Sequence, residues 1–268
     1  MKESRLKKSV ILSERLQMLA NMVTKGNRLV DVGCDHGFLP VYLVSTGICP
    51  KALAMDVREG PLDAARTHIA EFGLGDYIET RLSDGLEKCN AGEGDTLVCA
   101  GMGGRLMERI LTEGRDKVWG MKELILQPQS ELEEFRFFLK KSGFRIIQED
   151  AVLEDGKYYF AMKALPAREE PGDRKVCGSS GTEGDFAESK EIAGRYLVLY
   201  DRYGERLLHG RHPVLRQYLL QRKVCLEHLE VSLLSAGSQK AKTRLEEVRD
   251  ELTQIKAALD FFTEDRTG

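Results

Sequence analysis

The chain has 268 residues, a formal net charge of −3 and a hydrophobic fraction of 42%, which is typical of a globular protein with one large domain or a domain plus an appendage. No apolar stretch reaches the roughly 18 residues of a membrane span, and no apolar signal core follows the basic N-terminus, so we expect a cytoplasmic protein with no membrane partner. The six cysteines are scattered without metal-ligand spacing and predict reduced thiols and no bound metal.

Residues 13–24 show the apolar spacing of an amphipathic helix, and residues 29–32 form a short apolar run that indicates a buried parallel strand. The run ends in a turn built on Gly33 and Gly37, after which a second helix is expected to begin near residue 38. Glycine at such a turn lets a ligand approach the backbone closely. A strand–turn–helix of this kind also serves plain packing, so alone it does not decide between packing and binding.

The acidic residues of this turn favour a cationic ligand. Asp31 and Asp35 alternate with the two glycines, a spacing that differs from the Gly-x-Gly-x-x-Gly of a dinucleotide site. A carboxylate where a pyrophosphate would lie disfavours an anionic cofactor and suits S-adenosylmethionine (SAM), which carries an ammonium and a sulfonium group. A nicotinamide dehydrogenase is therefore the least favoured enzyme class.

Two further strand ends carry acidic residues. A strand over residues 52–56 ends at Asp56, about 20 residues beyond the turn, where a carboxylate can accept hydrogen bonds from ribose hydroxyls. A strand over residues 78–82 leads into Asp84 and Gly85, where a carboxylate can accept from an adenine amino group. The alternatives are a helix cap for Asp56 and a plain turn for the Asp-Gly pair.

A fourth strand, over residues 95–100, is followed by Gly101-Met102-Gly103-Gly104. Three glycines in four residues leave backbone amides uncovered and leave room for a flat ligand, which packing alone would not require. We therefore expect this loop to belong to the functional site.

The remaining strands complete one sheet. A strand over residues 124–128 is followed by alternating strands at 144–149 and 157–164, which a hairpin signal joins. Repeated β–α units that close with a hairpin predict an α/β fold: a doubly wound, Rossmann-like sheet with an antiparallel edge, as in many class I methyltransferases.

Beyond the sheet the composition changes. Pro, Gly, Ser and charged residues dominate the next segment and indicate a flexible linker or insertion. Apolar residues then recur every three or four positions over residues 213–234 and 239–262, which predicts an antiparallel coiled-coil helical hairpin. We expect a monomer, with dimerisation through these helices as the alternative. The predicted domains are 1–165 for the sheet, 166–189 for the linker and 190–268 for the helical part.

The helical part is also locally basic. Between residues 202 and 224, six Arg and Lys residues stand against Glu205 alone. Basic residues on helices usually form a solvated face. Because these residues are concentrated on a protein that is acidic overall, contact with phosphate groups is slightly favoured over a solvated face.

Five motifs occur in this order: Asp31-Val-Gly-Cys-Asp-His-Gly-Phe-Leu-Pro, Asp56-Val-Arg-Glu-Gly-Pro-Leu, Arg81-Leu-Ser-Asp-Gly-Leu, Ala100-Gly-Met-Gly-Gly and Leu126-Gln-Pro. Together they resemble the bacterial tRNA (adenine-22-N1)-methyltransferase family. The resemblance is close over residues 12–165 and extends to the architecture of 190–262, whereas 166–189 does not match. It implies methyl transfer from SAM to N1 of an adenine in the D arm of tRNA.

The resemblance also implies roles for individual residues. Gly101, Met102, Gly103 and Gly104 would position the substrate in place of the Asn-Pro-Pro-Tyr motif of amino-group methyltransferases. N1 of adenine has an in-plane lone pair and no proton, so positioning can replace a general base, and His36 is the one alternative proton acceptor. The cofactor cleft would comprise Asp31, Gly33, Asp35, His36, Gly37, Asp56, Asp84, Gly85, Ala100 and Gly101.

The substrate adenine would have to be exposed or flipped out of its helix, and basic residues would hold the tRNA backbone. A rival reading keeps the fold and makes the substrate a small molecule, with the hairpin as a lid or dimer element. Another reading is a binding module for SAM or RNA without turnover, which the intact cleft argues against. The predicted tRNA contacts are Lys7, Lys8, Arg15, Arg202, Arg206, Arg211, Arg216, Arg222 and Lys223.

Overall fold

The chain divides into two compact units, each with its own arrangement of elements. A computed structural model describes residues 10–167, 194, 196–236 and 238–263. The first unit is Met1–Arg168 and the second is Glu169–Gly268. Nearly all of the predicted linker, together with Lys7 and Lys8, lies outside the described residues.

The first unit is built on one seven-stranded sheet with the strand order β3-β2-β1-β4-β5-β7-β6. The first five strands are parallel, and β7 runs antiparallel to both β5 and β6. The predicted doubly wound sheet with an antiparallel edge hairpin is confirmed. The strands are β1 (Leu29–Val32), β2 (Ala52–Asp56), β3 (Ile78–Leu82), β4 (Thr96–Met102), β5 (Glu123–Pro128), β6 (Phe144–Glu154) and β7 (Lys157–Pro166).

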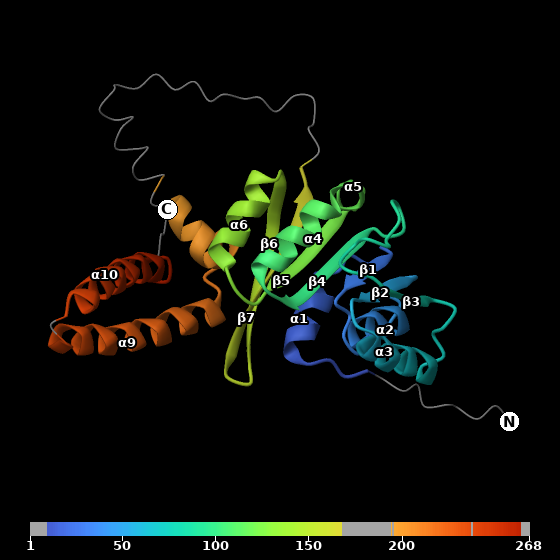
Figure 1. Cartoon of the computed structure of the whole chain (residues 1–268), viewed down its shortest axis with the longest axis horizontal. Helices are drawn as coiled ribbons and strands as arrows, with labels where there is room; N and C mark the ends of the chain where they lie inside the picture. The colour runs from blue at the N-terminus through green and yellow to red at the C-terminus, as the bar shows by residue number, and fades with distance from the viewer. Residues whose placement is uncertain (1–9, 168–193, 195, 237, 264–268) are drawn as a thin grey trace, which may run out of the picture. The chain divides into compact units, whose positions relative to one another are not determined.

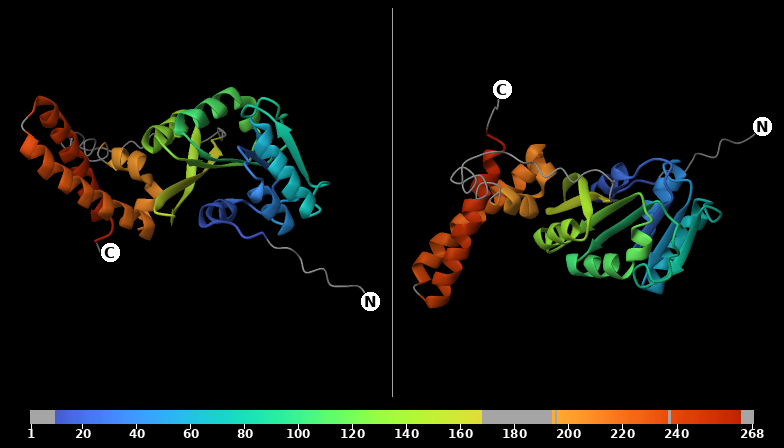
Figure 2. Two further views of the ribbon diagram at one scale, coloured as in Figure 1. Left: turned by 60° about the horizontal axis from the view of Figure 1, so that its bottom comes forward. Right: turned by 90° about the horizontal axis from the view of Figure 1, so that it is seen from above.

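Helices cover both faces of this sheet (Figure 1, Figure 2). Helices α1 to α3 pack on one face, where Leu19 and Leu62 belong to one core, and α4 to α6 pack on the other. Side chains alternate along a strand, so Leu53 and its neighbour Ala54 join opposite cores. The helices are α1 (Glu14–Met22), α2 (Phe38–Ser45), α3 (Glu59–Glu71), α4 (Gly104–Glu113), α5 (Arg115–Val118) and α6 (Leu132–Lys141).

The sheet reverses its winding between β1 and β4, because the chain continues from β1 to β2 on one side and later returns to place β4 on the other. Loops leave the carboxyl ends of these two strands in opposite directions and open a crevice between them. Ligands of doubly wound proteins bind at such a switch point.

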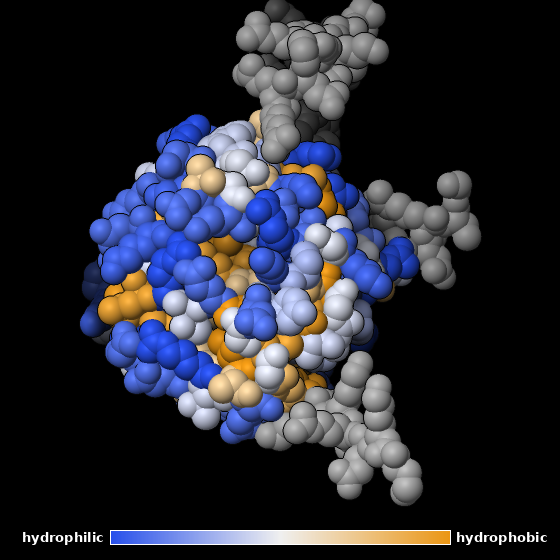
Figure 3. All heavy atoms as spheres, turned by 90° about the vertical axis from the view of Figure 1, so that its right-hand side faces the viewer, coloured by the Kyte–Doolittle hydropathy of each residue, from blue (hydrophilic) through white to orange (hydrophobic). Residues whose placement is uncertain are grey.

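The face of the first unit shown in Figure 3 is mainly hydrophilic, and apolar residues show between the polar ones, many of them toward the middle of this face. No helix among the described residues is long and apolar enough to cross a membrane. The described cysteines are all free thiols, and Cys34, Cys49, Cys89 and Cys99 are buried.

The described part of the second unit is helical. A short π-helix, η1 (Tyr200–Gly204), leads into α8 (Glu205–His209), which is followed by α9 (Pro213–Ala236) and α10 (Gln239–Asp260). Helices α9 and α10 lie side by side as the predicted hairpin (Figure 1). Their seam buries Leu215, Leu219 and Leu226 of α9 and Val248, Leu252 and Ile255 of α10.

Candidate functional site

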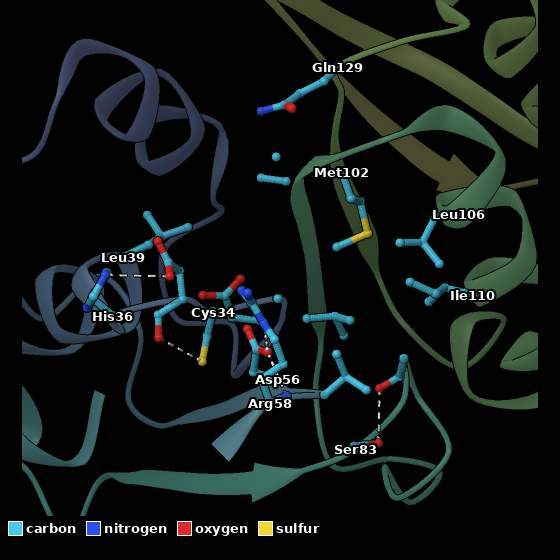
Figure 4. Close-up of a pocket in the computed structure, with 18 of the residues that line it drawn as sticks. Cys34, His36, Leu39, Asp56, Arg58, Ser83, Met102, Leu106, Ile110 and Gln129 are labelled. Atoms are coloured by element: carbon cyan, nitrogen blue, oxygen red, sulfur yellow. Dashed lines mark hydrogen bonds and ion pairs between the residues drawn. The ribbon is translucent and has the colours of Figure 1, made fainter. Parts of the chain in front are cut away.

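A cavity of about 590 Å³ opens at the carboxyl ends of β1, β2 and β4, at the switch point of the sheet. Of the residues predicted for the cofactor cleft, all but Gly37 line it, and of the loop predicted to position the substrate, Gly103 and Gly104 do not. Side chains from strand ends, turns and helix starts converge on this cavity (Figure 4). The predicted residues that line it are Asp31, Gly33, Asp35, His36, Asp56, Asp84, Gly85, Ala100, Gly101 and Met102.

Asp31 is the most deeply buried acid of the cavity. The residue is only 4% exposed, and burial raises the pKa of its carboxyl group to about 7, with a further contribution from the charge of Asp56. Asp56 is 6% exposed, and its Oδ1 accepts a hydrogen bond of 2.9 Å from the backbone N–H of Arg58. Two carboxyl groups at adjacent strand ends create a site that a cation would stabilise.

The turn after β1 takes its shape from three residues with positive φ: Gly33 (+77°), Asp35 (+49°) and Gly37 (+71°). A Cβ atom on Gly37 would lie 2.9 Å from the Cβ of Ala65 in α3, so this glycine allows close packing of the turn on a helix. Its position outside the cavity lining differs from its predicted place in the cleft. Asp35 adopts the left-handed conformation that few residues other than glycine visit, and the turn thereby holds its exposed carboxylate at the rim.

The three glycines that follow Ala100 in β4 have different roles, because one lines the cavity and two allow close packing. Gly101 has φ +78° beside a register shift between β4 and β5, and it lines the cavity. Gly103 and Gly104 instead face Ser130 and Glu131, and a Cβ atom on Gly104 would lie 2.8 Å from the Ser130 carbonyl oxygen. Two of the three glycines therefore allow α4 to pack closely on Ser130 and Glu131. From the sequence alone, all three are expected to leave backbone amides uncovered for a ligand.

Three arginines add positive charge to the cavity wall. Arg109 donates to Asp84 at 2.8 and 3.2 Å, so the carboxylate predicted to meet adenine already has a partner. Arg58 is largely exposed at the rim, and its Nε lies 3.8 Å from Oδ1 of Asp56. Arg15, from α1, donates from Nη1 to Oε1 of Gln127 at 3.2 Å, and its guanidinium lies 5.5 Å from the ring centre of Tyr159.

Comparison with known proteins identifies the family of this chain. Residues 12–162 match the family model of a methyltransferase domain. The chain is 31% identical over 251 residues to the tRNA (adenine(22)-N(1))-methyltransferase of Bacillus subtilis strain 168, which covers 93% of this chain and 97% of that protein. The chain belongs to the tRNA (adenine(22)-N(1))-methyltransferase family. The resemblance noted from the five motifs is thereby confirmed.

Solved structures of this methyltransferase family share the whole architecture. The crystal structure of the B. subtilis m1A22 tRNA methyltransferase superposes with a TM-score of 0.74 at 28% identity, covering 94% of this chain and 100% of that one. A Streptococcus pneumoniae protein assigned to the same reaction, in complex with SAM, gives a TM-score of 0.73 at 29% identity over 93% and 100% of the two chains. SAM-dependent chemistry is thus a property of the family.

His36 lies at the edge of the methyltransferase cavity, across from Leu106 and Ile110 (Figure 4). Its side chain is 52% exposed, and its Nε2 is 3.6 Å from Oδ1 of Asp35. A general base would be expected deeper in the cavity, close to the reacting atoms. The sequence alone did not place Arg58, Arg109 and Leu106 in the cavity wall, because Arg58 follows a strand end but is not acidic, and the other two lie on helix α4.

The basic residues of the second unit separate into two groups. Arg202 and Arg222 bind Glu251 of α10, and Lys223 lies 3.5 Å from Glu227. The sequence window counted Glu205 alone and left out both of these carboxylates, so it overstated the net positive charge of this surface. The exposed members of the predicted set are Arg206, Arg211 and Arg216.

Proposed function

We propose that this chain transfers the methyl group of SAM to N1 of adenine 22 in the D arm of tRNA. The observation that carries the proposal is the acidic cavity at the switch point, in a chain that matches a tRNA (adenine(22)-N(1))-methyltransferase over 93% of its length. Because the proposed substrate is a tRNA, we place the enzyme in the cytoplasm. We also expect it to act as a monomer.

The cavity residues fit SAM by charge. Asp31 and Asp35 supply carboxylates for its cationic groups, and the buried Asp31 gains most because an entering cation offsets its desolvation. Asp56, at the end of β2, would accept hydrogen bonds from the ribose hydroxyls of SAM. Ser83, Asp84 and Gly85 follow β3 and would flank the adenine of SAM. Arg109 holds the Asp84 carboxylate in place.

Arg15 completes the charge pattern. Its guanidinium lines the same cavity and donates to the neutral amide oxygen of Gln127. It is close to the backbone, 3.2 Å from the point where a Cβ atom on Gly101 would lie. We therefore assign Arg15 to the carboxylate of SAM. This role replaces the predicted contact with the tRNA backbone.

The reaction needs little from protein acids or bases. SAM supplies a methyl group on a sulfonium sulfur, and the lone pair of adenine N1 displaces the neutral thioether, so that the positive charge moves from sulfur to the adenine ring. No proton is released, which agrees with the exposed position of His36. The wall formed by Ala100, Gly101 and Met102 would hold the base in line with the methyl group.

The second unit, within the predicted helical domain 190–268, would bind the tRNA backbone through Arg206, Arg211 and Arg216. These side chains are exposed on α8, at the turn that follows it and on α9. Each phosphate contact that is removed should lower the salt dependence of binding by about one unit of slope. A variant with Glu at both 211 and 216 (Arg211→Glu, Arg216→Glu) should bind tRNA more weakly with a shallower slope, and unchanged binding would reject this role.

The proposal is tested by methyl transfer from labelled SAM to unmodified tRNA, followed by nuclease mapping of the product. We expect 1-methyladenosine in the D arm, and no product when adenine 22 is replaced. Cofactor binding without tRNA methylation would instead indicate a small-molecule methyltransferase with the same fold.

A further inference from the structure

Three aromatic rings form a cluster at the rim of the cavity, and the proposed chemistry does not use it. His36 and Phe38 come from the turn and the start of α2, and His68 comes from α3. The rings of Phe38 and His68 are 4.6 Å apart between centroids, and His36 lies 6.0 Å from Phe38 and 6.5 Å from His68. Phe38 is 40% exposed, although Leu39 and Val41, its neighbours on α2, are buried.

The fold holds these rings in place before any ligand arrives. The close approach of Gly37 to Ala65 seats the turn on α3, and His68 follows Ala65 by three residues on the same face of the helix. Nδ1 of His68 lies 2.8 Å from the carbonyl oxygen of His36. Because a carbonyl oxygen only accepts, Nδ1 carries the proton, and this hydrogen bond fixes the orientation of the ring.

We propose that His36, Phe38 and His68 form a stacking platform for a nucleobase of the tRNA that lies next to the target adenine. The inference rests on the proposed function and adds a second contact with the RNA. An adenine that leaves its helix also unstacks its neighbours. Proteins that bind unstacked bases stack them on aromatic side chains, histidine included.

The position of the platform and the charge beside it both favour a neighbouring base as its ligand. The target adenine must reach the wall at Gly101 and Met102 inside the cavity. The platform starts at the rim, where His36 and Phe38 belong to the lining, and continues to His68, which does not line the cavity. The carboxylate of Asp35 is largely exposed beside His36 and would repel a phosphate group but tolerate a neutral base. The ligand of the platform is therefore a base and not the RNA backbone.

The test combines protein variants with altered tRNA. Phe38→Leu keeps an apolar side chain without a ring, Phe38→Tyr keeps the ring, and His68→Ala removes a ring that lies outside the cavity lining. Tyr77→Leu is the matched control, since Tyr77 is a 51% exposed aromatic residue just before β3, at the amino-terminal end of the strands. Dissociation constants are measured for intact tRNA and for tRNA with an abasic nucleotide on either side of adenine 22.

We expect Phe38→Leu and His68→Ala to weaken binding of intact tRNA by about 5- to 100-fold, the range for loss of one base–aromatic stack. Phe38→Tyr and Tyr77→Leu should bind within twofold of the unaltered protein. An abasic site on one side of adenine 22 should weaken binding to the unaltered protein similarly, and should have little further effect in Phe38→Leu, because both changes remove the same contact.

Three results would overturn the platform: multiplicative losses in that cycle, unchanged binding of intact tRNA by both variants, or a loss of tRNA binding in Phe38→Leu or His68→Ala that parallels a loss of SAM affinity measured by calorimetry. Failure of the proposed function looks different. In that case the unaltered protein would transfer no methyl group to adenine 22.

Discussion

Two buried carboxyl groups, at opposite ends of the parallel strands, have opposite electrostatic environments. Glu123 begins β5 at the amino-terminal end of the sheet and accepts from Nζ of Lys163 at 2.8 Å, from the backbone N–H of Thr24 at 2.8 Å and from the hydroxyl of Thr96 at 2.7 Å. Burial alone would raise its pKa, but these donors together hold the pKa below the ordinary value. Asp31 lies in β1 toward the carboxyl end, and there burial raises the pKa instead.

The difference separates stability from function within one sheet. The buried carboxylate of Glu123, which also accepts from the Thr24 hydroxyl and so has four donors, needs no ligand to compensate its charge. A buried carboxyl group beside a second acid keeps its desolvation penalty until a cation arrives, so part of the binding free energy of the ligand comes from relieving that penalty. Destabilising groups of this kind are tolerated where function requires them.

The largest expected effect is on the stability side of this comparison. Glu123→Gln removes the charge that balances Lys163, whose side chain is only 11% exposed, and should lower the free energy of unfolding by about 3–5 kcal/mol. Denaturant unfolding measures this loss. Glu79→Gln is the control, because the exposed Glu79–Arg81 pair should contribute less than about 1 kcal/mol. Equal losses in the two variants would contradict the comparison.

Substitution of Asp31, the functional carboxyl group, should change the stability in the opposite direction. Asp31→Asn removes a charge that the empty cavity disfavours, so we expect the variant without cofactor to unfold at a higher temperature at pH 8. SAM binding should weaken by roughly 2–3 kcal/mol, or about 100-fold, because its cationic group loses a buried charged partner. Thermal unfolding and calorimetry provide the two measurements. A variant that is less stable without cofactor would show that the ionised Asp31 supports the fold.

The same group predicts a pH dependence. An unfolded carboxyl group titrates near pH 4, whereas Asp31 titrates near 7 in the folded protein, so this group's contribution to stability falls as the pH rises through that window. SAM should prefer the ionised form, and its affinity should rise about tenfold between pH 6 and pH 7.5 and then level off. Asp31→Asn should remove this dependence, and an identical profile in the variant would assign it to another group.

Much of the fold follows from patterns that are local in the sequence. Buried parallel strands are short apolar runs, and helices with an apolar face separate them, so the β–α order appears directly. The acids at the ends of β1 and β2 could be placed together because the carboxyl ends of adjacent parallel strands share one edge. The sequence therefore predicts Asp31 and Asp56 in one cleft, together with Asp84 and Gly101.

The contacts that were missed depend on tertiary packing. The pairing of Arg202 and Arg222 with Glu251 joins two helices across the hairpin, and no window around residue 210 contains that carboxylate. The packing of Gly103 and Gly104 on Ser130 and Glu131 likewise joins segments far apart in the chain. Spacing identifies which residue types meet a ligand at strand ends, but it does not show which of them already has a protein partner.

The smallest expected effect concerns Arg15, the cation that faces the acidic cavity from α1. Arg15→Gln should weaken SAM binding by about fivefold to tenfold, less than the loss of a whole hydrogen bond to a charged group, because Gln keeps a donor and loses only the charge. Arg66→Gln is a suitable control, since Arg66 binds Glu59 and Asp63 on the surface of α3 and does not line the cavity. Calorimetry with SAM and with its decarboxylated analogue separates the possible roles. If Arg15 binds the carboxylate, the analogue should bind both proteins equally, whereas an equal loss for both ligands would show that Arg15 acts on the shape of the cavity.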